Sequence, residues 1–152
     1  MSVVQGKRCE GKLKVQTAAY DFASYTHKIC SNEKVFLKRY RWCSTAKIIE
    51  AVDELAVYVD LANQVNIRKD LLPENLKKNL ELRQSYQHKA IELSIRVETL
   101  MEIAYRNNRA KENKPQPEEV IVGITEDKFN NWVGQLLDLR SLLRKWKESE
   151  RG

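Results

Sequence analysis

Apolar residues recur every three or four positions over most of this 152-residue chain, which is the period of an amphipathic α-helix. The first periodic segment runs from Val15 to about Ser31, whereas residues 1–14 have no usable period. We therefore predict a helix over 15–31 that follows a basic, flexible N-terminal tail at 1–14. Its buried stripe is predicted to contain Val15, Ala18, Ala19, Phe22, Ala23, Thr26, Ile29 and Cys30.

A second periodic segment begins near Lys38, after a break at 31–38 in which Phe36 and Leu37 are expected to plug the loop onto the core. Its apolar arc is broader than one neighbouring helix covers, so we expect two helices, a subunit interface or both to cover it. The predicted apolar positions are Trp42, Ala46, Ile48, Ile49, Ala51, Val52, Leu55, Ala56, Tyr58, Val59, Leu61 and Ala62.

The third and fourth segments have clear start signals. Pro73 suits the first turn of a helix that we extend to about Asn107, and Thr125 is a typical N-cap before acidic residues that favour a helix start. Residues 107–124 are a loop by composition. The predicted core positions are Tyr86, Ala90, Leu93, Val97, Leu100 and Ala104, then Phe129, Trp132, Val133, Leu136, Leu139, Leu143 and Trp146.

Four amphipathic helices with connections that suit antiparallel neighbours predict an all-α fold, an up-down-up-down four-helix bundle over residues 15–149. The steps of four and three in the third helix are typical of knobs-into-holes packing against near-antiparallel partners. Only "EEVIVGI", residues 118–124, has the β-branched density of a strand, and it is too short and isolated to form a sheet.

Several functional classes have no support in the sequence. There is no apolar run of 18 residues and no secretory signal, so we expect a cytoplasmic protein without a membrane partner. The three cysteines have neither disulfide nor zinc-site spacing. A Gly-rich phosphate loop, HExxH and GxSxG are all absent. We therefore expect no enzyme activity, no cofactor and no metal, which leaves a binding protein.

The net charge of +6 is segregated along the chain. Residues 28–41 contain five Lys and Arg but one Glu, whereas residues 42–66 contain one Lys and four carboxylates. Cations at the start of the second helix oppose its dipole, so a polyanion or an acidic partner is as good an explanation for them as ordinary solvation. Trp42 lies on the apolar face, where packing competes with base stacking. The candidate binding residues here are Lys34, Lys38, Arg39 and Arg41.

A second candidate row lies on the third helix. Arg83, Lys89 and Arg96 are six and seven residues apart, close to two helical turns, so they could contact phosphates along one side. Glu92 and Glu102 intervene, and such mixing of signs is also ordinary for a solvated helix surface. Both interpretations stay open for this row.

Four stretches resemble a known family. "DFASYTHKICSNEKVFLKRYRWC", "DLANQVN", "ELRQSYQHKAIELSIRVETLMEIAYR" and "WVGQLLDLRSLLRKWKES" are similar to the accessory variability determinants encoded beside reverse transcriptases in diversity-generating retroelements. That family is in turn similar to proteins encoded in intervening sequences of bacterial 23S ribosomal RNA genes. The resemblance covers about Tyr20 to Ser149.

The resemblance implies a homopentamer of four-helix bundles with a basic surface that binds nucleic acid and the reverse transcriptase. The expected function is that of a noncatalytic accessory subunit, which gathers the reverse transcriptase and its template RNA during mutagenic cDNA synthesis. The alternative is an oligomeric RNA-binding or structural bundle of the intervening-sequence type that has no polymerase partner.

Overall fold

The structure is a computed structural model, and it describes residues 3–37, 41–110 and 123–150; side chains are described for 14–37, 43–110 and 123–150. The described chain forms four long helices, α1 (Val3–Ser31), α2 (Ala46–Gln64), α3 (Pro73–Asn107) and α4 (Glu126–Ser149). Within these ranges the only β-type pairing is an isolated bridge between Arg109 and Ile124. The predicted all-α class is confirmed.

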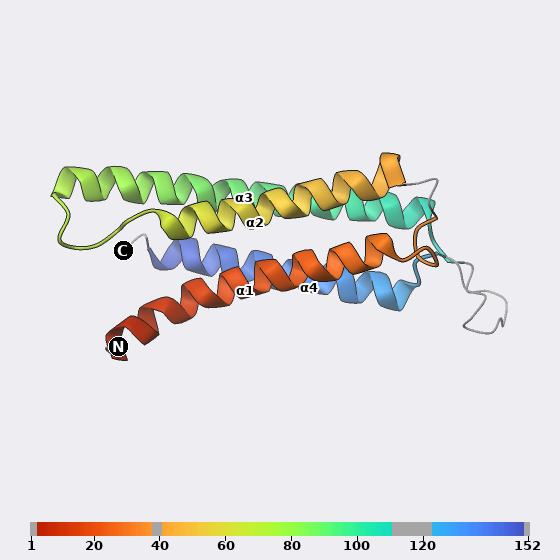
Figure 1. Ribbon diagram of the computed structural model, residues 1–152, viewed down its shortest axis with the longest axis horizontal. Coiled ribbons are helices and arrows are strands. Elements are labelled where there is room, and N and C mark those ends of the chain that lie inside the picture. The colour runs from red at the N-terminus through yellow and green to blue at the C-terminus, as the bar shows by residue number, and fades with distance from the viewer. Residues whose placement is uncertain (1–2, 38–40, 111–122, 151–152) are drawn as a thin grey trace.

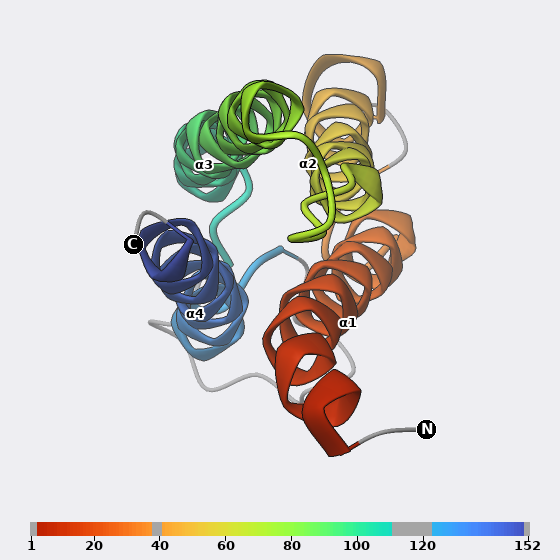
Figure 2. The same cartoon turned by 90° about the vertical axis from the view of Figure 1, so that its left-hand side faces the viewer.

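The helices form an antiparallel up-down-up-down bundle (Figures 1 and 2). Each helix packs against its neighbours in chain order, and α1 also packs against α4, which closes the ring. The apolar periods explain this arrangement, because each stripe faces the common axis. The core contains residues from all four helices and includes Phe22, Leu55, Val97, Trp132 and Leu136.

The predicted helix ends agree in part with the structure. α3 spans the predicted Pro73–Asn107, and α4 follows Thr125, whose Oγ1 accepts a hydrogen bond of 3.2 Å from the Lys128 backbone N–H. α2 begins later than predicted, at Ala46, after a short π-helical turn η2 (Arg41–Thr45). Residues 38–40 and 111–122 lie outside the described ranges.

The first helix differs most from the prediction, because α1 already starts at Val3 instead of Val15. Lys, Arg, Gln and Glu, which are common in residues 3–14, are good helix formers, and extending an existing helix costs little once its first turn has formed. The boundary predicted at residue 15 is therefore wrong as a helix start. The first turns of α1 diverge from the other three helices (Figures 1 and 2).

The end of the bundle that carries the α1–α2 connection is held by backbone hydrogen bonds between three segments. Gly123 N–H donates to the Lys34 carbonyl at 2.6 Å, and Ile124 N–H donates to the Asn108 carbonyl at 2.7 Å. Phe36 is buried and meets the Trp132 ring edge-on at 6.3 Å, as the plug prediction requires. Leu37 does not join it, because 37% of its surface is exposed.

Candidate nucleic-acid interface

The basic turn, our name for residues 34–41 of the sequence, begins at a loop that hydrogen bonds to Asn32 and Gly123 hold in place. Asn32 organises the chain, since its Oδ1 accepts a hydrogen bond from the Lys34 N–H at 3.0 Å and its carbonyl accepts bonds from Val35 and Phe36. The Lys34 side chain is exposed while the next two side chains are buried. The tie to Gly123 therefore fixes the backbone from which Lys34 extends into solvent.

The other cations of the basic turn are described only partly. Lys38 and Arg39 lie outside the described residues, and Arg41 is described as the first residue of η2 without its side chain. The backbone on both sides, at Leu37 and Arg41, belongs to the same end of the bundle. Of the four predicted cations, Lys34 and the backbone of Arg41 therefore lie at this end.

The row predicted on α3 is wrong for Arg83. Lys89 and Arg96 are exposed, whereas the side chain of Arg83 is 0% exposed and lies in the core between α3 and α4. Lys89 Nζ is 4.0 Å from a carboxylate oxygen of Glu92, and no ion pair of Arg96 occurs among the described residues. Two of the three cations therefore remain candidates for contact with phosphate.

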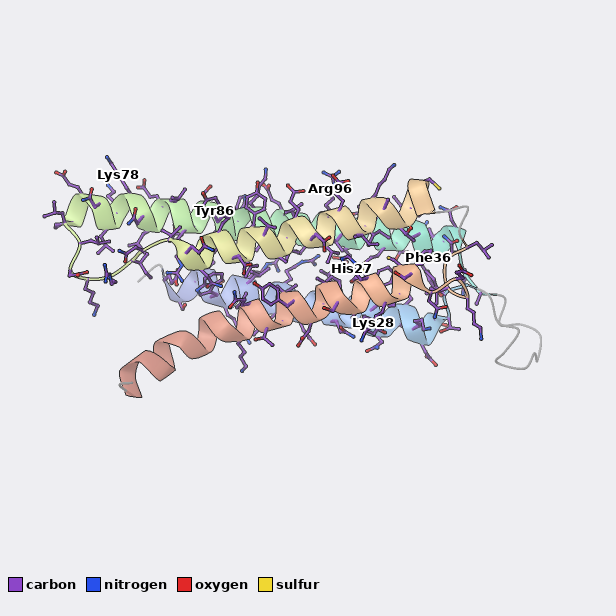
Figure 3. The ribbon with its side chains drawn as sticks, in the orientation of Figure 1. His27, Lys28, Phe36, Lys78, Tyr86 and Arg96 are labelled. Atoms are coloured by element: carbon purple, nitrogen blue, oxygen red, sulfur yellow. The ribbon has the colours of Figure 1, made fainter. Side chains whose placement is uncertain are left out.

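The structure does not bring Lys34 and the α3 cations together. Arg96 is eleven residues before the end of α3, which is roughly 16 Å along the helix axis from the end that holds the basic turn. Arg96 also lies on the opposite side of the bundle from Lys28 of α1 (Figure 3). A single bound strand would have to run along α3 to contact both groups.

Arg83 belongs to a buried polar cluster that the sequence pattern did not reveal. Its Nε lies 3.1 Å from Glu150 Oε2, and its guanidinium carbon lies 5.1 Å from the centre of the Trp146 ring. The contact with Glu150 is an ion pair without hydrogen-bond geometry, so the Arg83 nitrogens have no hydrogen-bond partner among the described residues. Burial lowers the pKa of Arg83, and the nearby Glu150 carboxylate opposes that shift.

Glu150 holds this cluster together. Its Oε1 accepts a 2.9 Å hydrogen bond from Trp146 Nε1, and its Oε2 accepts a 3.2 Å bond from Gln87 Nε2. A signal for the burial of Arg83 was present in the sequence, because it is seven residues before Ala90, a core position. The charge of Arg83 instead predicted a surface position, and its partner Glu150 lies 67 residues later in the chain.

A second surface feature is a shallow groove of about 590 Å³ between α1 and α2. Small side chains, Ala23 and Ala56, line it together with His27 and Asp53, whose Nε2 and Oδ1 atoms are 2.8 Å apart. Lys28 is at its edge. Because the groove combines a cation with a carboxylate, it has no net preference for a polyanion.

Neither a metal centre nor a membrane span occurs in the described residues. No cluster of three or more His, Cys, Asp or Glu side chains with metal-site geometry is found in these ranges. No described helix is long and apolar enough to span a membrane.

Comparison with known proteins found no matching family model, no matching curated protein and no matching solved structure. The resemblance to the retroelement accessory family therefore stays a prediction.

Proposed function

We propose that this protein is a noncatalytic accessory subunit of a diversity-generating retroelement, which as an oligomer binds a reverse transcriptase and its template RNA. The observation that carries the proposal is the exposed Lys34 at one end of the bundle, in a stretch of the sequence that is rich in Lys and Arg. Residues 28–41 contain five Lys and Arg but one Glu. Lys34 extends from a loop that a hydrogen bond to Gly123 holds in place. The choice of this family rests on the sequence resemblance.

Physical chemistry supports the RNA part of the proposal. Cations that neutralise phosphates release condensed counterions, which supplies affinity without reading the sequence of the RNA. Arg41 is the first residue of η2, and Lys38 and Arg39 precede it in the sequence. Positive charge at a helix start opposes the helix dipole, so helix stability does not account for these cations. Several copies of the basic turn in one oligomer would add avidity on a long RNA.

The test replaces Lys38, Arg39 and Arg41 together by Gln. We expect single-stranded RNA to bind more weakly and with a flatter dependence on salt, because fewer counterions are released per subunit. Folding should be unchanged or slightly improved, since each unfavourable contact with the dipole costs only about 0.3–1 kcal/mol. Fluorescence anisotropy with a labelled template RNA at several salt concentrations measures both the affinity and the salt slope.

A matched control removes the same number of charges elsewhere, at Arg144, Lys145 and Lys147 of α4. These cations are near the C-terminus of their helix, where the dipole accounts for them, so we expect a smaller loss of RNA affinity. An equal loss for both triple variants would mean that total charge, not the basic turn, determines binding. Copurification with the reverse transcriptase then distinguishes the retroelement function from an intervening-sequence bundle without a polymerase partner.

A further inference from the structure

The first turns of α3 contain leucines that no part of the described chain covers fully. No residue from Asn63 to Leu82, a fully described stretch, is buried. Leu72 is 69% exposed, and α3 extends past the end of α2 in this region (Figure 1). We call the α2–α3 connection and the first turns of α3 the leucine tip; its leucines are Leu71, Leu72, Leu76, Leu80 and Leu82.

The leucine tip continues the core stripe of α3. Leu76 and Leu80 precede Arg83 and Gln87 with steps of four, three and four residues, so all four residues lie on one face of the helix. Inside the bundle this face meets α2 and α4, but at the tip it is only half-buried. An amphipathic face of this kind is stable when something packs against it.

The leucine tip carries a small excess of positive charge. Lys77 and Lys78 follow Leu76 on exposed sides of α3, and neither forms an ion pair with a described residue. Figure 3 shows Lys78 pointing away from the bundle. In residues 68–81 four Lys and Arg accompany three carboxylates, one of which, Asp70, is 3.8 Å from Arg68.

A surface of opposite charge is found on α2. Val57 is 53% exposed, and Leu61, one turn later, is half-buried. Glu50 and Glu54 lie on the same side of this helix, are exposed and form no ion pair with any described residue. We call these four residues the acidic face of α2. In residues 42–66 four carboxylates accompany one Lys.

From these two surfaces we infer that the leucine tip of one subunit docks on the acidic face of α2 of a second copy of this chain. The leucines would cover Val57 and Leu61, while Lys77 and Lys78 would approach Glu50 and Glu54. Different surfaces meet in this contact, so it is heterologous and can close into a ring. The inference rests on the oligomer in the proposed function and names the surfaces that build it.

A symmetric contact of two tips fits the same observations less well. It would bring Lys77 and Lys78 of both copies together, and like charges at a contact disfavour it. It would also leave the acidic face of α2 uncovered. The two arrangements make different predictions for substitutions on α2, because a tip-to-tip dimer does not involve Glu50 or Glu54.

The experiment reverses each surface separately and measures mass by sedimentation velocity without RNA. One variant carries Lys77→Glu and Lys78→Glu, and the other carries Glu50→Lys and Glu54→Lys. We expect each variant alone to fall to the single-chain mass of 17.8 kDa. A mixture of the two should associate again, and so should one chain with all four substitutions, because both restore opposite charges across the contact.

Two controls make the result decisive. Arg144→Glu with Lys145→Glu reverses two exposed cations on α4 and should leave the wild-type mass unchanged. Leu72→Ser tests the apolar part at a side chain that is mostly exposed, so folding should persist while association weakens. Circular dichroism confirms the helical content of each variant.

Three results would overturn the inference: a wild-type protein of single-chain mass, full association of either reversed variant, or no recovery in both the mixture and the four-substitution chain. A loss of association with only the tip variant would favour the tip-to-tip dimer instead. RNA is absent from this experiment, so its failure is distinct from a failure of the RNA-binding proposal. Conversely, weak RNA binding by a correctly assembled ring would leave the interface in place.

Discussion

At the scale of single residues, the buried cluster around Arg83 depends on charge compensation in the core. A buried charge is tolerated when a partner of opposite charge stays close, and removing that partner leaves an uncompensated ion in the core. Glu150 is the only carboxylate that forms an ion pair with Arg83 among the described residues, and it also accepts hydrogen bonds from Trp146 and Gln87. The C-terminal turn of α4 therefore depends on one side chain.

We predict that Glu150→Gln lowers the free energy of unfolding by about 3 kcal/mol, the lower end of the range for breaking a buried ion pair. The lower end applies because 14% of the Glu150 side chain is exposed. Urea denaturation of the wild type and of the variant measures the change. Adding Arg83→Met to Glu150→Gln should recover most of the loss, since an apolar side chain needs no counter-charge. An unchanged urea midpoint for Glu150→Gln would contradict this role.

At the scale of elements, the connection between α3 and α4 depends on one glycine. Gly123 has φ +118°, a conformation that other residues rarely adopt, and a Cβ atom there would approach the Asn108 carbonyl oxygen to 2.6 Å. Its N–H donates to the Lys34 carbonyl, and its neighbour Ile124 pairs with the chain at Asn108 and Ala110. A side chain at this position would disturb the tie that holds the basic turn.

We therefore predict that Gly123→Ala destabilises the protein by about 1–3 kcal/mol, the usual cost of an unfavourable backbone conformation. Gly134 provides the matched control, because it lies inside α4 and a Cβ atom added there would meet no atom within 4 Å. Gly134→Ala should instead stabilise the helix by about 0.5–1 kcal/mol. Thermal unfolding of both variants tests the contrast, and equal melting temperatures would refute it.

The hydrophobic period predicted most of what is local in this molecule. The bounds of α3, the cap at Thr125 and most core positions of α4 are confirmed, because periods, prolines and capping residues act within a few positions. The burial of Arg83 was not predicted, since it depends on residues of another helix. The tie of Lys34 to Gly123 was not predicted for the same reason. Long-range pairings of polar groups leave little trace in a single sequence.

The candidate site follows the same division. The sequence alone grouped Lys34 with the cations that follow it, because these residues are close together along the chain. The sequence also grouped Arg83, Lys89 and Arg96 by their spacing. Spacing alone does not show which side of a helix faces the core when a charged residue interrupts the apolar stripe. The exposed leucines of the tip were not recognised, because an apolar period looks alike whether its cover belongs to the same chain or to another.

At the scale of the whole molecule, three ionisable groups link folding to alkaline pH. Burial raises the pKa of the Cys30 thiol to about 12, from an ordinary value of 9.0. A hydrogen bond to Asp60 raises the pKa of Tyr20, and burial lowers that of Arg83. The first two groups favour folding below their ordinary pKa values, and their contribution is lost as pH rises through the folded values. The contribution of Arg83 to folding stability changes in the opposite direction, because its pKa is lowered and not raised.

The thiol contribution can be isolated by substitution. With Cys9 and Cys43 replaced by Ser, we predict that the free energy of unfolding contains a Cys30 contribution that is constant below about pH 9. Between about pH 9 and pH 12 this contribution falls by about 1.4 kcal/mol per pH unit, because the unfolded thiol ionises while the folded thiol does not. Cys30→Ala removes it, whereas Tyr20 and Arg83 are present in both proteins and cancel in the difference. Urea denaturation from pH 8 to 11 should therefore give curves that converge with rising pH by about 3 kcal/mol. Parallel curves would mean that the Cys30 thiol ionises as readily in the folded core as in the unfolded chain.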